Sequence, residues 1–300
     1  MEGFPDTKHM VKTIHKKEYP AISPLNPANT AANKTVFITG GGTGIGYAIA
    51  RGFALAGAST IIITGRRANV LEASAKRLSE EIPSAQVLGY PLDISDSEAV
   101  DGTFAEVTKN LEPGKKIDIL VLCAAQGLPA GKALSFSTSQ IRAFTDTNIL
   151  GNINIVRAFL NTTDTSDAVI LEVASNAAHM VYPGMALYSI TKGAFTSFLR
   201  HIVAEYHGTG LRVHSFNPGS VLTDPAKEAG MDENSLPWDD ASLPAGFGVW
   251  LASPQAAFLH GRFVMSAWDV DELSKMKKQY LDDEDLGKIV LKIKPDLVFG

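Results

Sequence analysis

The sequence predicts a single-domain α/β protein, with a doubly wound parallel sheet of about seven strands and helices on both faces. Short apolar runs alternate with segments of helical periodicity, as in successive strand–helix–strand units. The runs are continuously apolar, such as Thr60-Ile-Ile-Ile63, which is typical of parallel strands covered on both faces. A glycine-rich turn lies between the first apolar run and the first helical segment. The length of 300 residues and the 45% hydrophobic content allow one large core.

The expected elements follow one another with short connections. Residues 1–33 contain Pro20, Pro24 and Pro27 and have little periodicity, so we expect an arm that is laid over the domain or partly disordered. Residues 34–268 form the main domain, and residues 269–300 form a C-terminal extension that packs on it. The expected strands are residues 34–39, 59–64, 86–91, 117–123, 168–174, 211–216 and 262–266, with helices between them.

Composition excludes several classes of protein. A net charge of −5 argues against nucleic-acid binding, which usually leaves a basic footprint. No apolar run approaches the ~18 residues of a membrane span, and the first residues lack the apolar region of a secretory signal. Cys123 is the single cysteine and is expected to be a buried, inert thiol. No His/Cys cluster indicates a metal. We therefore expect a cytoplasmic protein.

The glycine turn reads Thr39-Gly40-Gly41-Gly42-Thr43-Gly44-Ile45-Gly46. Glycines between a strand and a helix allow a tight turn, close approach of the backbone to a pyrophosphate, and close packing of helix on strand. The N-terminus of the helix then presents free N–H groups to the phosphates. The alternative is a flexible strand–helix connection without a ligand.

Tyr188 and Lys192 stand four residues apart, and Ser175 precedes the tyrosine by thirteen residues. On a helix, positions i and i+4 share a face. A tyrosine hydroxyl with a reference pKa of ~10 is a poor acid at neutral pH, but a nearby cation favours the phenolate and suits the phenol to general acid–base work. The alternative is a chance pair on a helix surface.

Together these motifs resemble those of the short-chain dehydrogenase/reductase family, which combine a TGxxxGxG loop, an asparagine, a serine and YxxxK. The resemblance covers roughly residues 34 to 266 and implies a Rossmann-like fold. It also implies a catalytic tetrad of Asn148, Ser175, Tyr188 and Lys192. Asn148, in an expected helix over 137–160, would hold a water that connects Lys192 to solvent, although it could equally be a polar residue at a helix bend.

The family resemblance also implies a cofactor site. A ribose 2′-hydroxyl is usually bonded by an acidic residue after the second strand, whereas a 2′-phosphate suits an arginine; Arg66 at this place favours NADP(H) over NAD(H). Thr43 departs from many NADP-dependent relatives, which carry a basic residue there, and both arginines, at 66 and 67, could simply be solvated. The implied cofactor-binding residues are Gly40, Thr43, Gly44, Ile45, Gly46, Arg66, Asp93, Ile94, Asn148, Tyr188, Lys192, Pro218, Val221 and Thr223.

Two of these positions have local alternatives, and one segment departs from the family. Asp93 would contact the adenine, or be a turn or N-cap aspartate. The segment 217–223 would hold the carboxamide through Val221 and Thr223, or be a simple turn. The chain has Leu122-Cys-Ala-Ala125 where relatives commonly have NNAG, which casts doubt on the hydrogen bonding between strands at that point.

The implied function is an NADPH-dependent reductase that transfers a hydride to a carbonyl, with Tyr188 as proton donor. The substrate pocket would be bordered by residues 126–134, by residues 179–183 and by a lid within 224–245. Met180, Tyr182 and Trp238 favour a small apolar or aromatic metabolite, and His179 is expected to be structural. The alternatives are an NAD(P)+-dependent alcohol dehydrogenase and a non-catalytic regulator or scaffold that binds nicotinamide.

The chain ends differ from those of most relatives. Residues 261–273 replace a short final strand, and a charged helical stretch to about Asp285 and an apolar tail follow. Together with the arm sequence YPAISP, this ending resembles that of fungal members of the family, many of which serve secondary metabolism. The resemblance also implies a homo-dimer or homo-tetramer formed through the helices that carry Asn148 and Tyr188.

Overall fold

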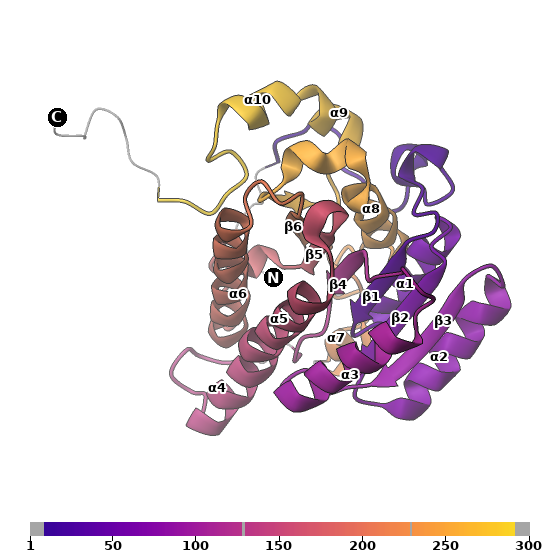
Figure 1. Ribbon diagram of the computed structural model, residues 1–300. Coiled ribbons are helices and arrows are strands. Elements are labelled where there is room, and N and C mark those ends of the chain that lie inside the picture. The colour runs from indigo at the N-terminus through magenta and orange to yellow at the C-terminus, as the bar shows by residue number, and fades with distance from the viewer. Residues whose placement is uncertain (1–8, 128–129, 229, 292–300) are drawn as a thin grey trace.

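The computed structural model describes residues 9–127, 130–228 and 230–291, and its sheet confirms the predicted fold class. Seven parallel strands lie in the order β3-β2-β1-β4-β5-β6-β7 (Figure 1). The strand order reverses between β1 and β4, where doubly wound sheets bind ligands. The strands are β1 (Thr35–Thr39), β2 (Thr60–Gly65), β3 (Gln86–Pro91), β4 (Ile119–Leu122), β5 (Val169–Val173), β6 (Arg212–Asn217) and β7 (Phe263–Met265).

Helices cover both faces of the sheet because alternate strand residues point to opposite sides. One core layer lies between the sheet and α1, α2 and α8, and the other lies between the sheet and α3, α5 and α6. In β1, for example, Val36 and Ile38 belong to the first layer and Phe37 to the second. The helices are α1 (Gly44–Leu55), α2 (Ala68–Glu81), α3 (Ser97–Asn110), α4 (Thr138–Thr145), α5 (Asn152–Thr162), α6 (Ala186–Glu205), α7 (Asp224–Glu228), α8 (Ser242–Ala252), α9 (Val270–Lys275) and α10 (Lys277–Asp282).

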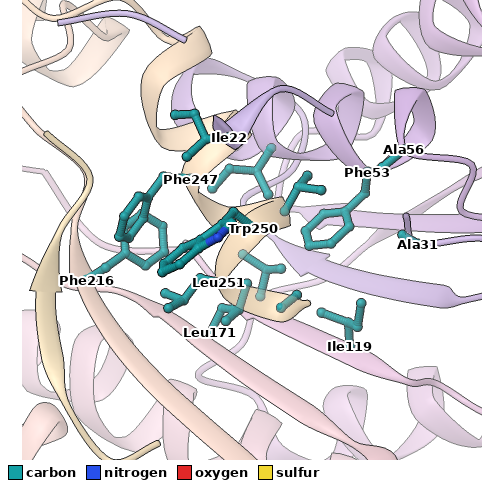
Figure 2. Packing of buried hydrophobic residues seen from close by; sticks show 14 of the residues in the cluster. Ile22, Ala31, Phe53, Ala56, Ile119, Leu171, Phe216, Phe247, Trp250 and Leu251 are labelled. Carbon is teal, nitrogen blue, oxygen red and sulfur yellow. The ribbon is translucent and has the colours of Figure 1, made fainter. Parts of the chain in front are cut away.

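Helix α8 is apolar all round and buried throughout from Leu243 to Ala252, as expected of a helix enclosed on every side. Its Phe247 packs between Phe216 of β6 and Trp250, with ring centroids 5.7 and 5.5 Å away, and Figure 2 shows Ile22 of the N-terminal arm above this cluster. A Cβ on Gly246 would lie 2.6 Å from the carbonyl oxygen of Ile22. Glycine at this position therefore allows the arm to cross the helix.

The described part of the arm, residues 9–33, joins elements that lie at the other end of the chain. Ile14 forms an antiparallel bridge with Trp268. The Tyr19 hydroxyl donates to the carbonyl of Trp268 at 3.2 Å and accepts from the amide of Val270 at 2.8 Å, so it bonds the backbone at the start of α9. Glu272 of α9 accepts hydrogen bonds from residues 12 and 13.

The C-terminal segment is fastened to β7 by a buried arginine. The guanidinium of Arg262 donates to the carbonyls of Tyr280 and Leu286, each at 2.8 Å, and to that of Glu284. The amide of Phe263 donates to the carbonyl of Gly287 at 2.7 Å. The expected helical stretch is present as α9 and α10, whereas most of the apolar tail lies outside the described residues.

The helix expected over residues 137–160 is present but contains a wider turn. A π-helical segment, Asp146–Gly151, joins α4 to α5 without a break. Such turns are rare and are frequent at functional sites, and this one contains Asn148. Hydrophobic periodicity does not predict it, because the cause is a set of contacts with distant elements described below.

No helix within the described ranges is long and apolar enough to cross a membrane.

We predict that Tyr19→Phe lowers the free energy of unfolding by about 1–3 kcal/mol, because the buried amide of Val270 loses its acceptor. Chemical denaturation measures this change. Tyr90→Phe is the matched control, since among the described residues its hydroxyl accepts a single 3.5 Å bond, from exposed Asn110. Equal losses in the two variants would contradict a fastening role for Tyr19.

Candidate active site

The glycine turn between β1 and α1 has the shape that the sequence predicted. Gly40 and Gly44 have φ angles of +67° and +54°, which side chains other than glycine rarely adopt. A Cβ on Gly46 would lie 2.2 Å from the carbonyl oxygen of Gly40. These positions leave an open cradle of backbone at the N-terminus of a twelve-residue helix, which fits a dinucleotide pyrophosphate.

Segments from two other strands reach the same turn. A Cβ built on Gly40 would meet the backbone of Ala124 after β4 at 3.1 Å, and one on Gly44 would meet Thr223 Cγ2 in the loop after β6 at 3.2 Å. The predicted pyrophosphate turn and carboxamide segment therefore lie against each other. The sheet brings them together although they are far apart in the sequence.

Arg66 and Asp93 follow the neighbouring strands β2 and β3. The hydrogen bonds from Ser95, at 3.0 Å from its amide and 2.7 Å from its hydroxyl, hold the pKa of Asp93 below its ordinary value, and the charge of Arg66 acts in the same direction. Arg66 is exposed, so its guanidinium can reach a ligand. The turn alternative for Asp93 is present in the structure, whereas the N-cap of α3 is Asp96.

Ile94 lies beside Asp93 but its side chain faces the core. It is 4% exposed and so close to Gly151 that a Cβ there would meet it at 2.7 Å. Its carbonyl accepts from Asn154 at 3.3 Å. If Ile94 contacts the cofactor, it does so through its backbone, and this contact stays a prediction.

Thr39 supplies the hydrogen bonding that the missing asparagines of the NNAG pattern left in doubt. Its buried hydroxyl accepts from the amides of Cys123 and Ala124, both at 3.0 Å, and donates to the carbonyl of Val121 at 3.4 Å. Asn152 adds a 3.5 Å bond to the carbonyl of Ala124. A strand threonine thus joins β1 to the end of β4, a role that sequence reasoning missed.

Cys123 is partly buried at the end of β4. Burial raises the pKa of its thiol to about 11, so the thiolate is scarce near neutral pH. Cys123 is less buried than expected, and the inertness of its thiol stays a prediction.

Tyr188 and Lys192 lie on the first turns of α6. Lys192 is 8% exposed, and its Nζ donates to the carbonyl of Val173 at 3.0 Å, at the end of β5. The same Nζ lies 5.9 Å from the centroid of the Tyr188 ring. A fixed cation thus stands beside a half-buried phenol, as the helical spacing predicted.

Ser175 follows β5 and begins a short turn of 3₁₀ helix, Asn176–Ala178. Its Oγ accepts from the amide of Ala177 at 3.2 Å, so the hydroxyl keeps its own hydrogen for donation. Asn217, at the end of β6, accepts from the amide of Asn176 at 3.2 Å. This bond fixes the serine turn against the neighbouring strand.

Asn148 connects the loop after β4 to the helix of the tyrosine. Its Oδ1 accepts from the amide of Gln126 at 2.7 Å, and its Nδ2 donates to the hydroxyl of Thr191 at 3.1 Å. Thr191 in turn donates to the carbonyl of Tyr188 at 2.9 Å. The carbonyl of Asn148 also accepts from the side chain of Asn152 at 3.1 Å. These bonds explain the wide helical turn, and sequence reasoning did not find Thr191 or Asn152.

Asp239 holds the predicted carboxamide segment by its backbone. Its carboxylate accepts from the amide of Ser220 at 2.8 Å, and its own amide donates to the carbonyl of Ser220 at 2.7 Å. Gly219, with a φ of +87°, lies so close that a Cβ would be 2.5 Å from the Asp239 carboxylate. Pro218, Val221 and Thr223 are therefore on a fastened segment.

Two of the three segments expected to border the substrate pocket contact each other. The amide of Gly131 donates to the carbonyl of Gly184 at 2.9 Å, which joins the loop after β4 to the loop after Ser175; residues 128 and 129 lie outside the described residues. Leu134 and Val181 of these loops are 99% and 84% exposed. Each of the two loops thus presents an exposed apolar side chain.

His179 and Trp238 make contacts away from any reacting group. The His179 ring packs edge-on against Phe263, with centroids 4.7 Å apart. Trp238 donates from Nε1 to the carbonyl of Asp232 at 2.8 Å and lines an open depression of about 590 Å³ with arm residues 14–17. Its place in the substrate pocket stays a prediction.

The fold and the site together define a dinucleotide-binding oxidoreductase. Residues 34–234 match the family model described as short chain dehydrogenase, so the chain belongs to the short-chain dehydrogenase/reductase family and is an NAD(P)-dependent oxidoreductase. It is 36% identical over 283 residues to a short chain dehydrogenase/reductase of Claviceps purpurea, covering 93% of each chain. It is 34% identical over 291 residues to one of Aspergillus aculeatus, covering 97% of this chain and 99% of the other. The predicted likeness to fungal members is confirmed.

Solved structures agree with the fold. A Beutenbergia cavernae protein assigned as an NAD(P)-dependent gluconate 5-dehydrogenase, with NADP bound at low occupancy, is 25% identical. It superposes with a TM-score of 0.71 over 80% of this chain and 97% of its own. Levodione reductase is 22% identical, with a TM-score of 0.72 over 78% and 96% of the two chains, and supports the fold alone.

We predict that Thr39→Val destabilises the protein by about 1–3 kcal/mol, because the amides of Cys123 and Ala124 lose their acceptor. Thr35→Val, in the same strand, is the matched control. The Thr35 hydroxyl is equally buried but has no partner within the described residues, so its removal should be neutral or stabilising. Chemical denaturation of both variants tests the pair, and faster amide exchange at 123 and 124 should accompany only Thr39→Val. Equal destabilisation would contradict the assignment.

Proposed function

We propose that this oxidoreductase is an NADPH-dependent reductase of a carbonyl in a small, apolar or aromatic metabolite, with Tyr188 as the proton donor. One observation carries the proposal: Lys192 is held by the carbonyl of Val173 with its cation beside the Tyr188 phenol. A positive charge fixed in this way lies beside the group that gains negative charge when Tyr188 gives up its proton.

Different residues of the chain would bind the cofactor and donate to the substrate. The backbone of the glycine turn would hold the pyrophosphate, and residues 218–223 would orient the carboxamide. The bound cofactor supplies a hydride to the carbonyl carbon. Tyr188 gives its proton to the oxygen that gains charge, and Ser175 donates a hydrogen bond to the same oxygen.

Lys192 and Asn148 would restore the proton of Tyr188. The buried ammonium of Lys192 stabilises the phenolate that forms when the proton leaves. A water held by Asn148 would connect Lys192 to solvent. Asn148 also positions Tyr188 and Lys192, because its bond to Thr191 holds the turn of α6 that carries both side chains.

The preference for NADP(H) rests on Arg66. It is exposed beside the end of β2, and a planar guanidinium can bond a 2′-phosphate through two N–H groups. No carboxylate stands in the sequence from Thr64 to Arg67 to accept from a 2′-hydroxyl. The NADP bound in the Beutenbergia cavernae structure is compatible with this preference.

Exposed apolar side chains on the two expected border loops support an apolar or aromatic substrate. Leu134 and Val181 present exposed side chains on the two loops that Gly131 and Gly184 join, close in sequence to Met180 and Tyr182. Burial of such surface is the main source of affinity for an apolar ligand.

A homo-oligomer formed through the helices of the site is part of the proposal. Ile141 of α4, Leu150 of the π-helical turn and Ile190 of α6 are 41%, 50% and 59% exposed. Exposed apolar side chains of this kind on neighbouring helices are typical of a subunit interface.

Tyr188→Phe should retain cofactor binding and lose turnover by at least about 100-fold, the usual contribution of a general acid. A screen of ketones, aldehydes and imines, followed by the absorbance of NADPH, identifies the substrate, and fluorescence titration measures cofactor affinity. A Phe variant that is as active as the natural protein would refute the role of Tyr188. Binding of cofactor without turnover of any carbonyl would favour a non-catalytic regulator.

Arg66→Asp should shift the ratio of kcat/KM for NADPH over NADH by about 10- to 100-fold toward NADH, because a charge-assisted bond worth about 1.5–3 kcal/mol is lost. Lys76→Asp, an exposed change of the same charge on α2, is the matched control and should leave the ratio unchanged. An unchanged ratio in Arg66→Asp would remove the argument for NADP(H).

A further inference from the structure

Glu172 is a buried acidic residue that the proposed reaction does not use. It lies in β5 and is 1% exposed, in a strand whose other residues are apolar. Its side chain is on the face of the sheet that α6 covers, as is that of Ile170 two residues earlier. A carboxyl in such a place costs free energy unless it has partners.

Two hydroxyls bond this carboxyl. Ser215, its partner in β6, donates to Oε2 at 2.6 Å, and Thr196 of α6 donates at 3.0 and 3.1 Å to the two oxygens. A hydroxyl can donate to a carboxylate or accept from a carboxylic acid by turning about its C–O bond. The site can therefore hold Glu172 in either state of charge without leaving a hydrogen bond unmade.

Lys192 is the charged group that faces Glu172. It stands one turn before Thr196 on α6, and its Nζ bonds the carbonyl of Val173, the residue after Glu172. Burial raises the pKa of Glu172, and the charge of Lys192 opposes that shift. Of the neighbouring strands, β4 places the apolar Leu122 opposite Glu172. Cys123 and His214 lie on the other face of the sheet.

A small cavity lies on the other side of the two hydroxyls. It has a volume of about 20 Å³ and is lined by Thr196 and Ser215, by Arg200 and Arg262, and by Gly287 and Lys288 of the C-terminal segment. This volume can hold one water. The buried Nε of Arg262, which has no partner in the described part of the chain, is a donor available to such a water.

We propose that Glu172 is a positioning residue whose ionisation sets how much of the charge of Lys192 acts on Tyr188. The inference rests on the proposed function, because it concerns the same tyrosine. When Glu172 ionises, its proton passes to the oxygen of Ser215, the hydrogen of that hydroxyl passes to a water in the cavity, and this water releases a proton to solvent. The carboxylate then offsets the lysine, and the phenolate of Tyr188 is less favoured.

The sign of the effect can be measured in a variant without the charge. Glu172→Gln keeps a side chain that can bond both hydroxyls but is always neutral, so Lys192 acts on Tyr188 at full strength. The limb of the pH profile of kcat/KM that reports ionisation of Tyr188 should move by about one unit to lower pH, in reduction and in oxidation. Glu81→Gln, on the surface of α2, is the matched control and should leave the limb in place.

A merely structural glutamate would change rate or stability without moving that limb. An unmoved limb in Glu172→Gln overturns the inference. If this variant does not fold, Ser215→Ala replaces it. Loss of the 2.6 Å bond disfavours the carboxylate, so this variant should move the same limb to lower pH.

Infrared spectroscopy of the protein without substrate tests Glu172 separately from catalysis. The C=O band of a buried carboxylic acid should disappear as pH rises, should be absent from Glu172→Gln, and should disappear at higher pH in Lys192→Met. This result together with no turnover of any carbonyl would reject the proposed function but keep Glu172 as an ionising partner of Lys192. A carboxyl that keeps one state of charge at every pH where the protein is folded overturns the inference even in an active enzyme.

Discussion

The bond from Lys192 Nζ to the carbonyl of Val173 is the interaction on which the site depends. A buried ammonium is costly unless it is bonded, and here the acceptor is a carbonyl at the end of β5, where the strand gives way to the serine turn. The bond therefore fixes α6 relative to the sheet at the carboxyl ends of the strands. Tyr188, four residues earlier, takes its position from the same helix, and Ser175 takes its position from the same strand. One bond thus aligns the two parts of the chain that carry the proposed catalytic residues.

Long-range contacts then hold the loops around this pair. Thr39 joins the ends of β1 and β4, Asn148 joins the loop after β4 to α6, and Asp239 holds the segment after β6 by its backbone. Each of these bonds connects residues from different elements, and each uses a side chain to hold a backbone group. The N-terminal arm supports one of these bonds indirectly. The carbonyl of Lys16 accepts from the amide of Asp240 at 2.7 Å, next to Asp239, so the N-terminal residues also restrain the segment expected to hold the carboxamide.

Local patterns in the sequence predicted much of the fold and the centre of the site. The apolar runs predicted seven parallel strands, and the four-residue spacing of Tyr188 and Lys192 predicted their shared face. These signals are local, because a strand or a helix face is decided by neighbouring residues. The roles of Thr39, Thr191, Asp239 and Glu172 could not be predicted in this way, since each depends on which distant backbone or hydroxyl the fold brings to it. The wide turn at Asn148 escaped prediction for the same reason. An asparagine in a helix is a weak signal until its partners at residues 126 and 191 are known.

The cost of burying Glu172 separates a structural from a functional explanation of that residue. A buried charge loses several kcal/mol of hydration per ion, which an opposite charge and hydrogen bonds regain only in part. An apolar residue in β5 would match the rest of the strand and would fill the layer between sheet and α6 without that cost. Thr35 and Thr64, in neighbouring strands, show that this sheet also buries hydroxyls that have no partner in the described residues, so a polar atom alone does not imply a function. Glu172 differs from them, because it has two hydroxyl partners, a cavity beside them and the charge of Lys192 acting on its carboxyl. A residue that breaks the local pattern at the one place where it can act on the site is better explained by the chemistry than by the fold.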